Sequence, residues 1–191
     1  MILVKCGANI GSGLQCQRHW VEKVNAKKIE LTANQVKQKV RTAIELLIRK
    51  DAHLLKIDVN ERSITHRLAL HLQDAFKGWD VDCEYNRNRY DTKKLFIGND
   101  VRITVETIQS DDEQGKTVYP DIIVHHRDTD QNLLVVEVKK TTSHVPKNFD
   151  LDKLREYKRQ LGYSHSLFLS FVTGSPEKIE VEEEIWIDDG G

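Results

Sequence analysis

Two apolar runs separated by a short polar stretch occupy residues 118–140, VYPDIIVHHRDTDQNLLVVEVKK. This pattern predicts a β-hairpin, because both runs have the length and residue types of strands and the residues between them favour turns. A turn centred on Thr129 pairs Ile122 with Val136 and brings Asp121 opposite Glu137. Since both faces of the hairpin are apolar, we expect a sheet that is covered on both sides, as in an α/β fold.

Three charged residues interrupt the apolar pattern of the hairpin: Asp121, Glu137 and Lys139. Lys139 shares a face with Glu137, because side chains alternate along a strand. Two acids directly opposite each other destabilise a sheet, and a cation between them removes that repulsion. Mg²⁺ binds one or two carboxylates together with water and substrate phosphate, and a lysine stabilises charge that develops on phosphate. The hairpin therefore predicts a catalytic metal site, with solvent-exposed strand ends as the alternative explanation.

Pro120-Asp121 on one arm and Glu137-Val138-Lys139 on the other resemble the motif of the PD-(D/E)xK nuclease superfamily. The resemblance covers residues 60–173 and is closest to small stand-alone members of that superfamily. It includes a helix with an early acid, Glu61, followed by the segments VDCEYNR, DLDKLREYKRQ and SLFLSFV. It implies a restriction-endonuclease-like fold with an αβββαβ core, in which a mixed sheet of about five strands has helices on both faces.

The resemblance also implies Mg²⁺-dependent cleavage of a nucleic-acid phosphodiester, with DNA favoured over RNA. Asp121 and Glu137 would ligate the metal with the backbone carbonyl of Val138, and Mn²⁺ would substitute for Mg²⁺. Lys139 would orient the attacking water or stabilise charge on the phosphate. Glu61 would assist through a second metal or a water, although the helix dipole alone also favours an acid in the first turn of a helix.

Basic residues in two segments are candidates for phosphate contacts, since Lys and Arg neutralise phosphate charge on binding. The net charge of −1 argues against indiscriminate binding of nucleic acid. Residues 139–160 nevertheless contain seven Lys or Arg and three Asp or Glu, whereas residues 177–189 are strongly acidic. A solvated surface explains these charges equally well. The candidates, in a polar loop at 86–99 and in a helix near residue 150, are Arg87, Arg89, Lys93, Lys94, Lys153, Lys158 and Arg159.

The rest of the pattern predicts one nuclease-like domain, residues 31–191, after an N-terminal extension of unclear structure at residues 1–30. Thr32 and Gln35 match a capping box for a helix that runs to Lys50, and Asn60 is a favourable N-cap for a second helix. A third helix is expected from Asp150. Strands are expected at 81–85, 101–108 and 166–172, and an acid-rich strand or tail is expected at 178–188. Four histidines are expected on the surface or half exposed: His66, His71, His125 and His126.

Three cysteines form an odd count without a disulfide framework, which predicts reduced thiols and a cytoplasmic protein. Cys6, Cys16 and His19 lack the paired spacing of a zinc site. The chain has no apolar run of about 18 residues, the minimum for a membrane span, and MILVKCGANIGSG lacks the apolar stretch of a signal peptide. We therefore expect no membrane segment, and nothing indicates a homodimer.

Two other functions stay open at the level of sequence. One is a nucleic-acid-binding or interaction protein that keeps the fold without catalysis. The other is a metal-dependent hydrolase that acts on a different phosphate compound. The presence of Asp121, Glu137 and Lys139 together favours chemistry, because a binding protein has no need of two facing acids.

Overall fold

The structure, a computed structural model, describes residues 31–85 and 119–187, together with the backbone pairing of short strands between these ranges. The chain divides into two units, Met1–Glu30 and Leu31–Gly191, and the described residues all belong to the second. Cys6, Cys16, His19 and the expected strand at 101–108 lie outside the described residues.

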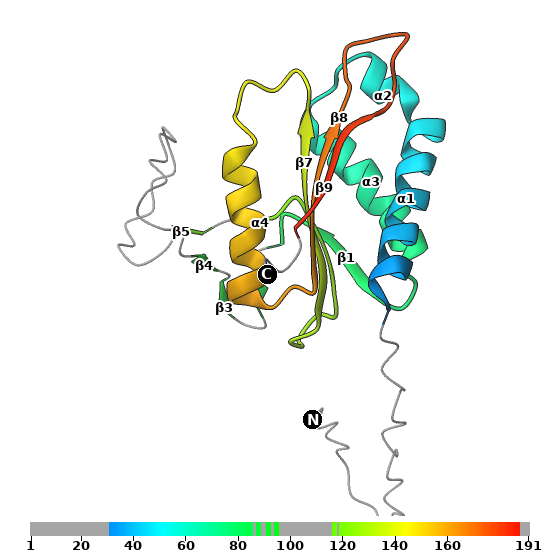
Figure 1. The fold of residues 1–191 in the computed structure, drawn as a ribbon. Coiled ribbons are helices and arrows are strands. Elements are labelled where there is room, and N and C mark those ends of the chain that lie inside the picture. The colour runs from blue at the N-terminus through cyan, green and yellow to red at the C-terminus, as the bar shows by residue number, and fades with distance from the viewer. Residues whose placement is uncertain are drawn as a thin grey trace, which may run out of the picture. The chain divides into compact units, whose positions relative to one another are not determined.

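A five-stranded mixed sheet with the order β1-β6-β7-β8-β9 forms the centre of this unit (Figure 1). All neighbouring strands are antiparallel except β7 and β8, which are parallel. The strands are β1 (Asp80–Cys83), β6 (Ile122–His125), β7 (Asn132–Lys140), β8 (His165–Phe171) and β9 (Val181–Trp186). Two short pairs lie outside this sheet, β2 (Arg87–Asn88) with β3 (Asp91–Thr92) and β4 (Lys94–Leu95) with β5 (Lys116–Thr117). The expectation of an α/β fold with a mixed five-strand sheet is confirmed.

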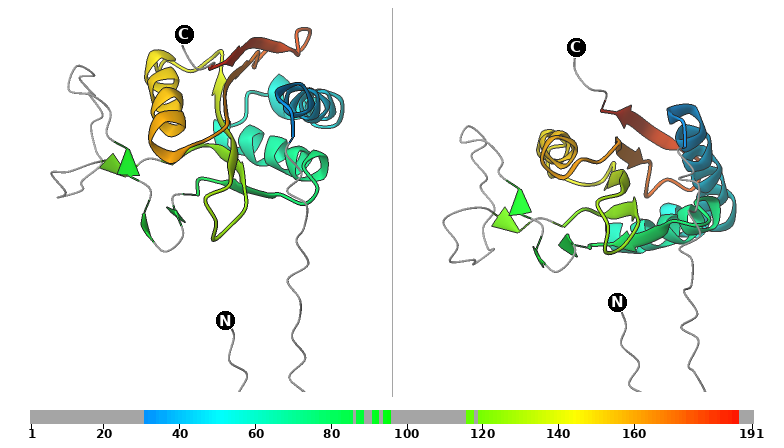
Figure 2. Two further views of the ribbon diagram at one scale, coloured as in Figure 1. Left: turned by 60° about the horizontal axis from the view of Figure 1, so that its bottom comes forward. Right: turned by 90° about the horizontal axis from the view of Figure 1, so that it is seen from below.

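Helices cover both faces of the sheet (Figures 1 and 2). On one face, α1 (Ala33–Lys50) and α3 (Glu61–Ala75) pack against Leu134 and Val136 of β7; the short helix α2 (Ala52–Lys56), which joins them, was not predicted. On the other face, α4 (Asn148–Leu161) packs against Val135. Alternate residues of β7 therefore enter two separate cores, which explains why the strand is apolar throughout.

The register of the hairpin is the predicted one. Ile122 pairs with Val136, and Val124 pairs with Leu134. The register shifts between Val124 and His125, so the pairing of the two strands becomes irregular next to the turn. Asp121 directly precedes β6, where Pro120 removes no hydrogen bond from the ladder. Both positions of the motif are thus held at one end of the hairpin.

The helix starts follow their capping residues. Thr32 and Gln35 form the capping box of α1, and the Asn60 side chain accepts a hydrogen bond from Ser63 N at the start of α3. Helix α4 begins at Asn148, two residues before the predicted start, and ends at Leu161; Gly162 follows in the left-handed conformation that glycine tolerates. Among the described residues, no helix is long and apolar enough to cross a membrane.

Two histidines differ from their predicted exposure. His71 and His125 are buried, and each forms a hydrogen bond to a carboxylate from another element: His71 Nε2 to Asp51 Oδ2 at 2.7 Å, and His125 Nε2 to Asp82 Oδ2 at 2.9 Å. Buried polar groups need such partners. The partners are distant in sequence, so the local pattern around each histidine did not reveal them.

Candidate active site

The two halves of the motif meet through Asp121. Its Oδ2 atom accepts a hydrogen bond of 2.7 Å from the backbone N–H of Val138, the central residue of Glu137-Val138-Lys139. Asp121 lies one residue before the ladder begins at Ile122, so its carboxylate is free to reach across to β7. Asp121 therefore contacts the second arm of the hairpin directly, through the backbone of Val138.

Glu137 lies deep beneath α4, with 2% of its surface exposed. Its Oε2 atom accepts a hydrogen bond of 2.7 Å from Lys153 Nζ. Its Oε1 atom is buried and has no hydrogen-bond partner among the described residues. Burial raises the pKa of Glu137 well above its ordinary value, although the positive charge of Lys153 acts in the opposite direction. A buried carboxylate oxygen without a donor is costly, which indicates that a further group belongs beside it.

Lys139 lies on the same side of β7 as Glu137 and forms an ion pair with Asp150 of α4. Asp150 Oδ1 is also 3.7 Å from Lys153 Nζ. Acidic and basic side chains thus alternate in a cluster of four residues, which we call the charge cluster: Glu137, Lys153, Asp150 and Lys139. Residues two apart on a strand and three apart on a helix share one face, which is why β7 and α4 present two charges each.

Glu61 is the first residue of α3 and lies beside the same end of β7. Its Oε2 atom accepts a hydrogen bond of 3.2 Å from the backbone N–H of Lys140. Lys140 fixes this helix start further, because its Nζ atom is 2.9 Å from both Asp58 Oδ1 and the carbonyl oxygen of Val59. Glu61 therefore occupies the helix end that faces the hairpin motif, and its catalytic role stays a prediction.

The site carries an excess of closely spaced negative charge. Burial raises the pKa of Asp121 to about 6; the Val138 N–H and Lys153 act to lower it, and Glu61 and Asp150 act to raise it. The pKa of Lys153 is also raised: desolvation opposes its charge, but Glu137 and Asp150 more than compensate. Carboxylates held this close together favour an added cation.

The donor set fits Mg²⁺ or Mn²⁺ at Asp121 and Glu137, with the backbone carbonyl of Val138 as the further ligand that the resemblance implies. In residues 31–85 and 119–187, no group of three or more His, Cys, Asp or Glu is arranged to hold a metal ion. Mg²⁺ does not require one, because it keeps several waters and uses one or two carboxylates. The unpartnered Oε1 atom of Glu137 is the observation that fits a cation or its bound water.

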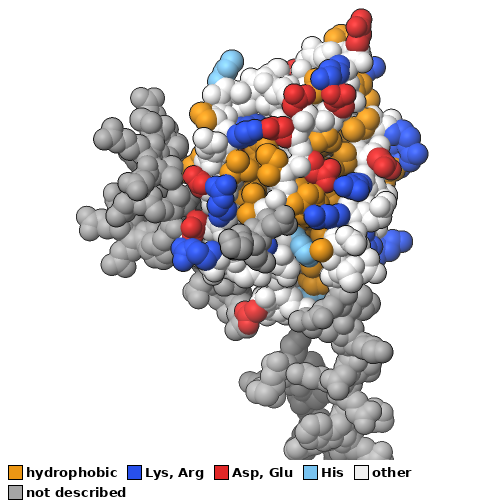
Figure 3. All heavy atoms as spheres, in the orientation of Figure 1, with side chains coloured by type: hydrophobic (Ala, Val, Ile, Leu, Met, Phe, Trp, Pro, Cys, Tyr) orange, Lys and Arg blue, Asp and Glu red, His pale blue; other side chains and the backbone are white. Residues whose placement is uncertain are grey.

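The basic segment 139–160 does not form an open cationic surface. Acidic and basic side chains are interspersed on the face drawn in Figure 3. Ion pairs in this segment include Lys139–Asp150, Lys140–Asp58, Lys147–Glu183, Lys153–Glu137, Arg155–Asp152 and Arg159–Glu156. The local excess of positive charge is therefore largely neutralised by neighbouring acids.

The candidate phosphate contacts separate into three groups. Lys153 is 9% exposed and paired with Glu137, so it does not lie where a surface phosphate contact was expected. Lys158 donates a hydrogen bond to the carbonyl oxygen of Ile187, and Arg159 is exposed beside Glu156. The side chains of the four loop candidates lie outside the described residues: Arg87, Arg89, Lys93 and Lys94.

Sequence reasoning missed the part that α4 plays in the site. The pattern around Asp150 indicates only a helix start, and it places Lys153 on the surface. Asp150 and Lys153 are three residues apart, so they lie on one face of the helix. This spacing is the sequence signal that could have indicated their shared role. What the spacing does not reveal is that this face covers Glu137 and Lys139.

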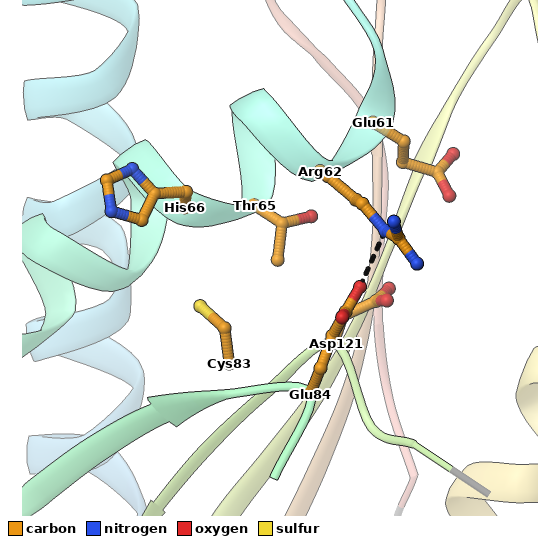
Figure 4. A pocket seen from close by; sticks show the side chains of 7 residues that line it. All are labelled: Glu61, Arg62, Thr65, His66, Cys83, Glu84 and Asp121. Carbon is orange, nitrogen blue, oxygen red and sulfur yellow. Dashed lines mark ion pairs between the residues drawn. The ribbon is translucent and has the colours of Figure 1, made fainter.

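A pocket of about 410 Å³ opens beside this site, between α3 and β1 (Figure 4). Asp121 and Glu61 line it, together with residues of α3 and the end of β1. Cys83 is a further lining residue, and desolvation together with the charges of Asp121 and Glu84 raises the pKa of its thiol to about 11. The thiol is therefore protonated at neutral pH and is no nucleophile there.

Comparison with known proteins adds no assignment to this geometry. No family model matches the chain, and neither a curated protein nor a solved structure matches it.

Proposed function

We propose that the protein is a Mg²⁺-dependent nuclease with a restriction-endonuclease-like core. The observation that carries the proposal is the contact between Asp121 Oδ2 and Val138 N, which joins the two halves of the motif beside the unpartnered Oε1 atom of Glu137. Without the short strands β2 to β5, which lie outside the main sheet, the chain order is α3, β1, β6, β7, α4, β8. This order supports the proposal, since it is the αβββαβ order that the resemblance implies.

Each residue has a defined task in this proposal. Asp121 and Glu137 hold the cation, which lowers the pKa of a bound water and neutralises charge on the scissile phosphate. Lys139 stabilises the negative charge that develops on that phosphate as the water oxygen bonds to phosphorus and the bond to the leaving oxygen breaks. Glu61 orients the water. Lys153 holds Glu137 in place through Oε2, and Oε1, which has no partner among the described residues, is the atom available to the cation.

A non-catalytic nucleic-acid-binding protein is the second candidate, and one observation favours it. Within the charge cluster, Lys139 and Lys153 already balance Glu137 and Asp150 without a metal. Such a cluster is a self-sufficient structural unit if no cation enters. The two candidates differ in one measurable property, the response of the folded protein to divalent cations.

The test measures metal-dependent stabilisation and cleavage on the same samples. Melting temperature is recorded in EDTA, Mg²⁺ and Mn²⁺, and labelled DNA and RNA are incubated under the same conditions. The nuclease proposal expects a rise in melting temperature with metal, because a ligand that binds the folded state stabilises it, together with cleavage. Asp74→Asn, which changes an exposed acid on α3, is the matched control and should behave as wild type. A wild-type protein that neither responds to metal nor cuts either nucleic acid contradicts the proposal.

A further inference from the structure

The pocket between α3 and β1 is crossed by an ion pair that belongs to none of the predicted site residues. Arg62 Nε lies 2.7 Å from Glu84 Oε1, and the two side chains are 84% and 45% exposed. Figure 4 shows them pointing toward one another beside Asp121. Arg62 is the second residue of α3 and Glu84 directly follows β1. The pair therefore links the two elements that form the pocket.

The backbone of Glu84 adjoins the proposed metal ligand. Glu84 has a φ of +49°, a left-handed conformation that costs a non-glycine residue energy. Its backbone N–H donates a hydrogen bond of 3.3 Å to the carbonyl oxygen of Asp121. The chain thus turns sharply at Glu84 while it stays attached to Asp121. A strained residue in this position points to a role for its side chain.

The charges in the pocket define what it accepts. Three carboxylates line it, from Glu61, Glu84 and Asp121, against the single guanidinium of Arg62. A cation bound at Asp121 offsets part of this negative charge. The positive charge of Arg62 and the negative charge of Glu84 then neutralise each other. A phosphate is then the group that competes with Glu84 for Arg62, because a guanidinium binds carboxylate and phosphate with the same planar fork. The volume of about 410 Å³ lies within the range of small-ligand sites.

We propose that this pocket receives the nucleotide adjoining the scissile phosphate, and that Arg62 binds the phosphate of that nucleotide in exchange for Glu84. This inference rests on the nuclease function proposed above. Arg62 is a substrate-binding residue in it, and Glu84 is an internal competitor that occupies Arg62 in the free protein. Only a ligand that brings a phosphate to Arg62 displaces Glu84, so the pair selects for a nucleic-acid strand that extends beyond the cleaved bond.

The test relies on opposite expected changes in DNA affinity when Arg62 and Glu84 are replaced one at a time. Arg62→Gln removes a phosphate contact, so DNA binding should weaken by about tenfold, the lower range for a hydrogen bond to a charged group. The slope of log Kd against log salt concentration should fall by about one, as for one lost phosphate contact. Glu84→Gln frees Arg62, so DNA binding should tighten. A merely structural ion pair predicts the same direction for both variants, since either change breaks it.

General charge effects are measured on a second exposed pair. Arg155 Nη1 lies 2.6 Å from Asp152 Oδ1 on α4, with side chains 57% and 37% exposed. Arg155→Gln and Asp152→Asn make the same changes of charge away from the pocket. Binding of a fluorescein-labelled DNA oligonucleotide is followed by anisotropy with Ca²⁺ in place of Mg²⁺, and a gel verifies that the oligonucleotide stays intact. Cleavage in Mg²⁺ is also measured, and Arg62→Gln should raise KM more than it lowers kcat.

The outcomes separate this inference from the function on which it rests. Opposite shifts for Arg62→Gln and Glu84→Gln that exceed those of the α4 pair support the exchange. If the wild-type protein cleaves DNA but the two pocket variants bind DNA no differently from the two α4 variants, the exchange is wrong and the proposed nuclease function still holds. A wild-type protein that neither binds nor cuts nucleic acid overturns both. Melting temperatures verify that all four variants are folded, which is expected because the changed side chains are exposed.

Discussion

Lys153 Nζ lies 2.7 Å from Glu137 Oε2, so an acid of the proposed metal site is held by a lysine from the helix that covers it. Both residues are buried. The pair therefore connects the stability of the fold with the geometry of the site. It also makes the two acids unequal, because Asp121 accepts a backbone N–H whereas Glu137 accepts an ammonium group.

Lys153→Gln should lower the free energy of unfolding by about 3 kcal/mol, since removal of one partner leaves a buried charge without compensation. Arg159→Gln is the matched control on the same helix. Its side chain is 67% exposed in the pair with Glu156, so this variant should change stability by less than about 1 kcal/mol. Urea unfolding in EDTA measures both. Equal stabilities for the two variants would show that Glu137 does not depend on Lys153.

Replacement of the motif residues should divide metal binding from chemistry. Asp121→Asn and Glu137→Gln should each lose most of the Mg²⁺-induced rise in melting temperature and lower cleavage by at least about a hundredfold, a typical loss for a group that acts in the transition state. The double variant should lose little more, because residues that act as a unit are not additive. Lys139→Ala should keep the metal response and lose the rate. Cleavage at the wild-type level in all three single variants would contradict the site.

The metal-free stability of the protein should depend on pH through Asp121. The pKa of this carboxyl is about 6 in the folded protein, against an ordinary value of 3.8. Between these values the unfolded chain has released the proton while the folded protein retains it, so stability falls as pH rises from about 4 to about 6. Asp121→Asn lacks this loss. The free energy of unfolding of this variant, relative to wild type, should therefore increase across that pH window and stay constant above it. Urea unfolding in EDTA measures both proteins as a function of pH. If the two pH profiles run parallel, the pKa of Asp121 is not raised.

Tyr157→Phe should raise the stability of the metal-free protein by about 1 kcal/mol, because an unpartnered buried hydroxyl carries a desolvation cost. The hydroxyl of Tyr157 is buried without a hydrogen-bond partner among the residues that the structure describes. Tyr163, whose ring packs edge-on against Tyr157, is also buried. Tyr163→Phe is the matched control and should not raise stability. A loss of stability in Tyr157→Phe would show that water or a bound group satisfies the hydroxyl in solution.

Glu61→Gln should abolish cleavage while it leaves the melting temperature unchanged. The glutamine oxygen still accepts the hydrogen bond from Lys140 N that Glu61 accepts now, so the junction between α3 and β7 is preserved. Glu61→Ala removes that acceptor as well, and should lower both cleavage and stability. Cleavage by Glu61→Gln at the wild-type rate would restrict Glu61 to a structural role at the helix start.

Local sequence rules predicted the elements that depend on neighbouring residues. The capping box of Thr32 and Gln35 and the N-cap of Asn60 are made within one helical turn. The hairpin register follows from a turn between two apolar runs, and this register alone brings Asp121 beside the Glu137-Val138-Lys139 segment. These features rest on contacts across a few residues or one turn, where the identity of each side chain is sufficient.

The tertiary structure decided which charges meet. The sequence by itself determined a covered hairpin with two acids and a lysine at one end, because period and turn chemistry act locally. It did not determine that α4 lies over that end, so the predicted surface position of Lys153 is wrong and the residue pairs with Glu137 instead. The burial of His71 and His125 against Asp51 and Asp82 was missed for the same reason. Pairing of buried charges depends on the packing of elements far apart in the chain, and packing is a property of the whole fold.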